Sequence, residues 1–78
     1  MSLVAYANHV IRELVEHPDD VQFTIMEGDR SSVLEVRCHS DDIGKLIGKN
    51  GKTISAIRVL IGQAAARQGR RALIEIVE

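Results

Sequence analysis

IGKLIGKNGKT, the sequence of residues 43–53, is the most informative stretch of this chain. It predicts a short apolar helix, a two-glycine loop that carries a lysine, and the start of a second helix. Gly48 and Gly51 lack a Cβ atom, so the backbone can turn sharply there and a sugar-phosphate chain can come close to it. We expect free N–H groups near Gly51 and Lys52, where the dipole of the second helix favours an anion. The stretch is therefore predicted to bind phosphate.

Two familiar nucleotide-binding motifs do not fit this loop. A Walker A loop has the form GxxxxGK[ST] and follows a strand. Here Leu46 stands where the first Walker glycine would be, and the residues before the loop have a helical pattern. The dinucleotide-binding pattern GxGxxG does not occur in the sequence. Nucleotide hydrolysis is therefore not expected.

Basic residues are concentrated around this loop and after it. The net charge is −1, but residues 1–39 carry seven acids and three bases, which gives −4, and residues 40–78 carry four acids and seven bases, which gives +3. Clustering of one sign of charge is the electrostatic footprint of a surface that binds a polyanion. The seven bases of the second half are Lys45, Lys49, Lys52, Arg58, Arg67, Arg70 and Arg71.

The pattern of apolar residues predicts the element order α-β-β-α-α-β. Helical and alternating periods distinguish the helices from the strands, Pro18 ends the first helix, and Gly69 ends the last one. Ser40 followed by two acids is typical of a helix start. The predicted elements are helices over residues 3–16 and 52–68, strands over residues 21–27, 33–39 and 72–77, and a short helix that begins at Ser40 and runs into the loop.

This order predicts an α+β domain that occupies residues 1–78. A crossover from the second strand through two helices should be right-handed and should place the third strand parallel to the second. The expected result is a three-stranded mixed sheet with the helices packed on one face. A chain of 78 residues has room for one core only.

The loop and the element order together resemble the KH domain. Residues 47–54 read Ile-Gly-x-x-Gly-x-x-Ile, which is similar to the signature of that family, whose loop clamps about four nucleotides of a single strand. The extra helix and strand at the N-terminal side resemble the type II arrangement. Nearly the whole chain is similar to the small stand-alone bacterial KH-domain proteins of the KhpA type.

The resemblance implies a set of RNA-binding residues. The loop would hold the RNA backbone, and aliphatic side chains would accept the nucleobases. Lysines and arginines before and after the long helix would hold further phosphates. Only Tyr6 and Phe23 are aromatic, so a fold that stacks bases on aromatic platforms is disfavoured. The expected RNA-binding residues are Gly48, Lys49, Asn50, Gly51, Lys45 and Lys52 at the loop, Ile43, Ile47 and Ile54 beside it, and Arg67, Arg70 and Arg71 before the third strand.

One face of the long helix carries no charge and predicts a contact between proteins. A free helix surface normally carries charged residues, whereas small uncharged residues allow another helix to approach. We expect a dimer contact through Ser55, Ala56, Val59, Gly62, Gln63 and Ala66.

Other chemistry finds little support in the sequence. A single cysteine, Cys38, excludes an internal disulfide and argues against a zinc site. Asp41 and Asp42 are better explained by the helix start than by a metal pair. No catalytic arrangement is apparent, and the histidines (His9, His17 and His39) show no ligand spacing. We therefore expect no enzyme activity, metal, cofactor or small-molecule substrate.

The resemblance implies capture of single-stranded RNA in the cytoplasm, with no membrane segment. Proteins of the KhpA type are linked to RNA binding and, in some bacteria, to cell shape and division, which suggests a post-transcriptional regulator or RNA chaperone. The family is described as self-associating and as pairing with a larger multidomain KH protein, KhpB. The alternative is a protein–protein interaction module with a vestigial loop and the long helix as its working surface.

Overall fold

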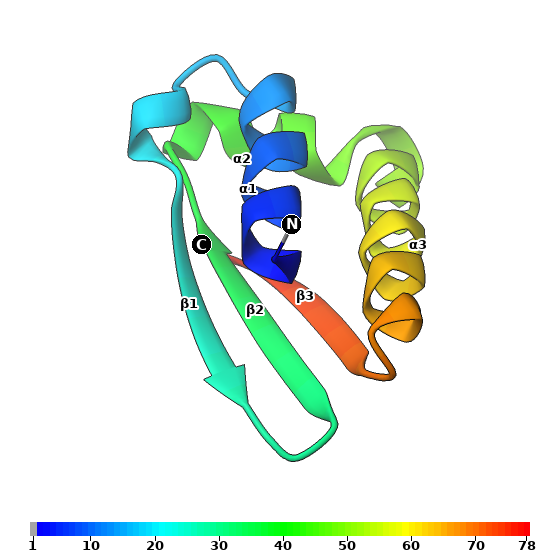
Figure 1. The fold of residues 1–78 in the computed structure, drawn as a ribbon. Helices are drawn as coiled ribbons and strands as arrows, with labels where there is room; N and C mark the ends of the chain where they lie inside the picture. Colours follow the sequence, from blue (N-terminus) through cyan, green and yellow to red (C-terminus); the bar gives the residue numbers. More distant parts are fainter. Residues whose placement is uncertain (1) are drawn as a thin grey trace.

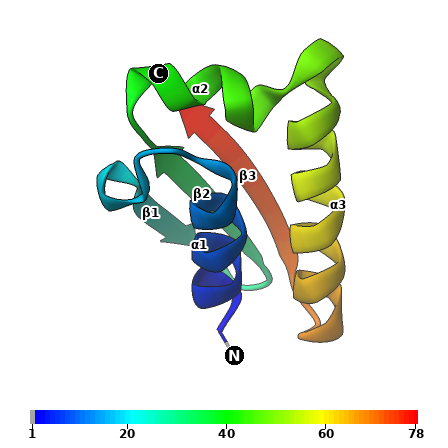
Figure 2. The same ribbon diagram turned by 90° about the horizontal axis from the view of Figure 1, so that it is seen from above.

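The helices and strands of the structure follow the predicted order. This computed structural model describes residues 2–78. Figures 1 and 2 show the helices gathered on one face of a three-stranded sheet, so the predicted α+β fold is confirmed. The elements are α1 (Leu3–Leu14), β1 (Gln22–Glu27), β2 (Ser31–Arg37), α2 (Ser40–Ile47), α3 (Lys52–Arg67) and β3 (Arg71–Val77), with short 3₁₀ turns at Pro18–Asp20 and Lys49–Gly51.

The sheet has the order β1-β2-β3, with β2 in the centre. β1 and β2 form an antiparallel hairpin in which Ile25 lies opposite Leu34. β2 and β3 are parallel, with Leu34 opposite Ile74, and the chain crosses from one to the other through α2 and α3. The parallel third strand is confirmed. Because α2, the loop and α3 all belong to this crossover, the loop lies at the end of the sheet where β2 and β3 finish (Figure 1).

The core lies between the sheet and the helices. β2 alternates strictly, with Ser32, Leu34 and Val36 buried against the helices. Each large aliphatic side chain that is removed from water in this way contributes about 1.5–3 kcal/mol. No helix within residues 2–78 has the length and apolar character needed to cross a bilayer. The helices contribute to the core Leu3, Ala7 and Ile11 from α1, Leu46 from α2, and Ile54, Ile57, Ile61 and Ala65 from α3.

The first helix ends earlier than its apolar pattern predicts. α1 stops at Leu14, two residues before the expected end. The backbone N–H groups of Glu16 and His17 donate to the two carboxylate oxygens of Asp42, at 3.1 and 3.0 Å. The chain thus leaves the helix to reach a buried carboxylate, and the His17 ring also contacts Asp42, with Nδ1 3.2 Å from Oδ2.

The start of α2 also differs from the prediction. Ser40 lies inside the helix, and the N-cap is His39, whose Nδ1 accepts the N–H of Asp41 at 3.1 Å. Asp41 and Asp42 lie in the first turn of α2 as expected, and the fully buried Asp42 also accepts the N–H groups of Glu16 and His17. The expected strand over residues 33–39 is shifted as well, because β2 begins at Ser31 and ends at Arg37.

Candidate nucleic-acid interface

The loop between α2 and α3 is a tight turn in which three of four residues have a positive φ. Gly48 ends α2 with φ 78° and ψ 170°. Asn50 (φ 56°) and Gly51 (φ 73°) both lie in the left-handed region, and α3 begins directly after them at Lys52. Asparagine and glycine tolerate that region better than other residues do. The sequence Gly-Lys-Asn-Gly thus matches the conformation of the turn residue by residue.

The two glycines are required for different reasons. A Cβ atom at Gly48 would lie against the Thr53 hydroxyl and only 2.6 Å from the Cβ of Thr53, so the start of α3 leaves no room for a side chain. A Cβ atom at Gly51 would have no heavy atom within 4 Å. Gly48 therefore permits close packing of the loop on α3, whereas Gly51 is favoured by its positive φ alone.

Two of the amides that were expected to be free are used by the turn itself. The Gly51 N–H donates to the Gly48 carbonyl at 3.1 Å, and the Lys52 N–H donates to the Lys49 carbonyl. The prediction of free N–H groups at these two positions is therefore wrong, because the loop closes as a 3₁₀ turn. No side chain within residues 2–78 caps the first turn of α3, and that turn contains no acid. The helix dipole there remains available to an anion.

The lysines around the loop differ in their surroundings. Lys49, Asn50 and Lys52 are exposed, and neither lysine forms an ion pair with any of the described residues 2–78. The Lys45 Nζ lies 3.3 Å from the Glu16 carboxylate, although both side chains are well exposed. Lys49 and Lys52 are thus free to meet a phosphate, whereas Lys45 would first have to leave Glu16.

The three isoleucines beside the loop are not equally accessible. Ile43 is half-buried and Ile47 is 38% exposed, and their spacing places both on the same side of α2. Ile54 is only 8% exposed and belongs to the core. The structure therefore brings Ile43 and Ile47 together as a small aliphatic surface next to the loop, with Ile54 packed in the core instead of facing solvent.

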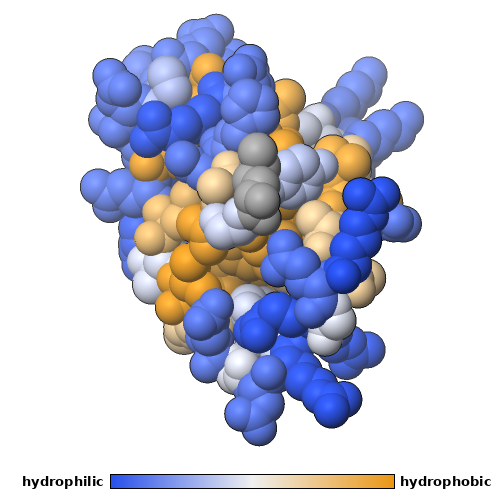
Figure 3. All heavy atoms as spheres, viewed as in Figure 1, coloured by the Kyte–Doolittle hydropathy of each residue, from blue (hydrophilic) through white to orange (hydrophobic). Residues whose placement is uncertain are grey.

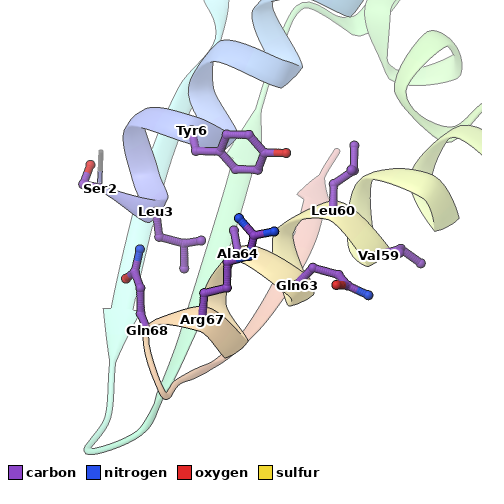
Figure 4. Close-up of a pocket in the computed structure, with 9 residues that line it drawn as sticks. All are labelled: Ser2, Leu3, Tyr6, Val59, Leu60, Gln63, Ala64, Arg67 and Gln68. Carbon is purple, nitrogen blue, oxygen red and sulfur yellow. The ribbon is translucent and has the colours of Figure 1, made fainter.

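The three arginines do not join the lysines. They lie at the far end of α3, and a helix of 16 residues is about 24 Å long. The Arg70 Nη2 donates to the Ser32 hydroxyl at 2.9 Å and lies 3.4 Å from the Ser31 carbonyl oxygen, which ties the turn after α3 to the hairpin. Figure 4 shows the Arg67 side chain extending between α3 and α1 toward Tyr6. The basic stretch of the sequence is thus divided between two ends of the domain.

The uncharged face of α3 borders a groove. Of the six residues expected at a dimer contact, five are exposed and Gly62 is half-buried. Val59 is 60% exposed, and Leu60, which sequence reasoning missed, is 46% exposed. Leu60 lines a cavity of about 500 Å³ between α1 and α3 (Figure 4) and a second one farther along the same two helices. Figure 3 shows hydrophobic surface around the start of α1 and toward α3.

Two ionisable groups among residues 2–78 have shifted pKa values. Burial, and secondarily the Asp42 carboxylate, raises the pKa of the Cys38 thiol, which disfavours the reactive thiolate. Burial alone would raise the pKa of Asp42, but the hydrogen bonds from Glu16 and His17 outweigh it, so this pKa is lowered. Asp42 is therefore a carboxylate that holds structure, and Cys38 is a small packing residue.

Comparison with known proteins identifies the family. Residues 5–76 match the family model described as KhpA/KhpB, KH domain. The chain belongs to this KhpA/KhpB family of KH domains. Among similar proteins named RNA-binding protein KhpA, that of Streptomyces coelicolor is 43% identical over 87% of this chain and 86% of its own length. That of Borreliella burgdorferi is 39% identical over 88% of this chain and 84% of its own length.

Solved structures show the same fold in part of a larger protein. The KH-like fold of this chain matches Aquifex aeolicus Era bound to GDP·AlF4⁻ with a TM-score of 0.59 and 23% identity, over 97% of this chain and 31% of the Era chain. A second match with the same TM-score and 24% identity is Era in complex with MgGDPNP and nucleotides 1506–1542 of 16S ribosomal RNA. The chain spans about a third of Era, and at this identity the likeness concerns the fold alone.

Proposed function

We propose that this protein binds single-stranded RNA without catalysis, through the loop between α2 and α3. The observation that carries the proposal is the Gly48–Gly51 turn with exposed Lys49 inside it and exposed Lys52 directly after it, neither of which forms an ion pair with residues 2–78. The lysines would attract the ribose-phosphate strand, and Ile43 and Ile47 would accept bases beside it. Membership in a family whose relatives are named RNA-binding proteins supports this function.

The binding site is short, so the affinity of one copy should be modest and sensitive to salt. Each phosphate contact releases counterions from the RNA, so the binding constant falls as the salt concentration rises. Two copies acting on one RNA would raise the overall affinity by increasing the effective concentration of the second site. We propose that the protein acts in the cytoplasm as a post-transcriptional regulator or RNA chaperone, with effects on cell shape and division.

The direct test replaces the two central loop residues with acids. The double variant Lys49→Asp with Asn50→Asp should lose binding to a fluorescein-labelled pool of random single-stranded RNA, measured by anisotropy. The matched control is Arg30→Asp with Ser31→Asp, which makes the same change of charge at two exposed positions, the last residue of the hairpin turn and the first residue of β2. Circular dichroism establishes that both variants are folded. Retained RNA binding by a folded loop variant would show that the loop is not the site.

A second function is favoured by the groove between α1 and α3. Val59 and Leu60 are consecutive large apolar side chains of α3 that are about half exposed, and a patch of exposed apolar surface is typical of protein contacts. We propose that this surface joins two copies of the chain, or one copy and a KhpB-type protein. Val59→Asp with Ala56→Asp should yield a monomer in sedimentation experiments on a protein that otherwise self-associates. An unchanged assembly would exclude this surface.

A further inference from the structure

Two histidines that are far apart in the sequence lie against each other beside the start of α2. The rings of His17 and His39 are stacked, with their centroids 4.0 Å apart and their planes inclined by 14°. The carboxylate of Asp41 is next to them, so that one possible ligand atom from each of the three residues lies within 4.8 Å of the others. Two imidazoles and a carboxylate at such separations are a typical ligand set for a transition metal.

The His17 ring is held by a second carboxylate. Its Nδ1 lies 3.2 Å from Oδ2 of Asp42, which is fully buried and fixed by two backbone N–H groups. A proton on Nδ1 satisfies this contact and leaves the lone pair of Nε2 directed away from Asp42. A carboxylate that orients an imidazole through its other nitrogen is the arrangement found around histidine ligands in metal sites.

The three side chains are accessible and lie in a negatively charged region. The exposed fractions are 40% for His17, 36% for His39 and 76% for Asp41. Glu16 precedes this cluster, and two further acids follow His17 in the Pro18–Asp20 turn. Among the described residues, the acid Glu16 is paired with a cation, the Lys45 ammonium. A cation can therefore reach the cluster and is favoured by its charge.

We propose that His17, His39 and Asp41 bind a divalent zinc-type ion, with Asp42 as a positioning residue. A tetrahedral Zn²⁺ ion with bonds of about 2.0–2.1 Å brings its ligand atoms to roughly 3.3 Å from one another, and water would fill the fourth position. The lone pairs of an imidazole lie in the ring plane, so the exposed His39 ring must turn out of the stack. Its hydrogen bond from the Asp41 N–H is released or rearranged as it does so.

The proposal is independent of RNA binding and has a structural consequence. His17 follows α1, whereas His39 and Asp41 open α2, so a bound ion joins two segments that are distant in the sequence. An ion that binds the folded chain only stabilises it in proportion to its concentration. The same ion would fix the start of α2, the helix that ends at Gly48.

The test is titration of the protein with ZnCl2, followed by calorimetry and by thermal unfolding. We expect one ion per chain and a rise in Tm of about 10–20 °C when free Zn²⁺ is about 100-fold above its Kd. His17→Asn keeps a donor for Asp42, and His39→Asn keeps an N-cap acceptor, so both variants should fold. Each variant should bind Zn²⁺ at least tenfold more weakly, because the loss even of a residue that only orients a metal ligand lowers metal affinity by roughly 10–100-fold.

The matched control is His9→Asn, which removes an exposed imidazole from α1 outside the cluster. It should bind Zn²⁺ as the natural chain does, and Asp41→Asn should bind more weakly. The proposal is overturned if Zn²⁺ produces neither heat nor a change in Tm. It is equally overturned if His9→Asn loses as much affinity as the two cluster variants, because binding would then be a general property of surface histidines.

Discussion

The two ends of α3 carry the same kind of charge and use it differently. At its start, Lys49 and Lys52 are exposed around a tight turn and form no ion pair within residues 2–78. At its end, Arg70 is half-buried and bonded to the hairpin, and Arg67 extends toward Tyr6. A cation that already has protein partners has less to offer a phosphate than one surrounded by water. The count of bases in a sequence therefore overstates the surface that is available to RNA.

The largest expected effect is on the turn at the start of α3. Gly48→Ala should lower the free energy of unfolding by about 2–5 kcal/mol, because the new methyl group meets Thr53 and φ is positive. Gly51→Ala should cost only about 1–2 kcal/mol, because its methyl group meets no atom within 4 Å. Urea unfolding measures both values. Equal losses would mean that the turn adjusts to a side chain at position 48.

The far end of α3 should respond through stability and leave RNA binding unchanged. Arg70→Gln removes the hydrogen bond to Ser32 and should cost about 1–2 kcal/mol in the free energy of unfolding. Arg71→Gln is the control, since Arg71 is exposed and the same charge is lost. If Arg70→Gln instead weakens RNA binding at full stability, the two ends of α3 act as one surface.

The loop end should respond through salt dependence. Lys49→Gln and Lys52→Gln should each reduce the slope of log K against log salt by roughly 0.7, the value for one phosphate contact on a single strand. Arg71→Gln should leave this slope unchanged. Anisotropy titrations with short single-stranded RNA at several salt concentrations give the three slopes. Identical changes in all three variants would contradict the distinction between the ends.

The smallest effect concerns the acid that holds Lys45. Glu16→Gln should release the Lys45 ammonium and raise RNA affinity roughly twofold, since an exposed ion pair contributes only about 0.2–1 kcal/mol. Glu13→Gln makes the same change of charge on α1 without touching Lys45. A similar gain in both variants would indicate a general charge effect and not the release of this lysine.

Local patterns predicted most of the fold. The order of elements and the glycine turn depend on residues close together in the sequence, where periodicity and turn chemistry apply. The parallel third strand follows from the handedness of the crossover. The N-cap shifted from Ser40 to His39 because an imidazole nitrogen took the acceptor role of the hydroxyl. Boundaries of this kind depend on a single side chain and are the hardest to predict.

Contacts between distant residues could not be predicted. Arg70 lies 38 residues from Ser32 in the sequence and His17 lies 25 residues from Asp42, so no spacing rule relates either pair. The sequence therefore did not predict the hydrogen bond from Arg70 to Ser32 or those that Asp42 accepts from the segment after α1. The histidines appeared unrelated for the same reason, although two of them are stacked.

The hydrogen bond inside the loop also bears on how the protein ages. An Asn-Gly pair loses ammonia when the following amide nitrogen attacks the asparagine side chain and forms a cyclic imide, and water then opens the imide to a carboxylate. Here the Gly51 nitrogen is already engaged with the Gly48 carbonyl at 3.1 Å, which restrains that attack while the turn is intact. Storage under conditions that loosen the turn would convert Asn50 to aspartate or isoaspartate. Old preparations would then carry a negative charge in the middle of the loop and repel the very polymer they are assayed against.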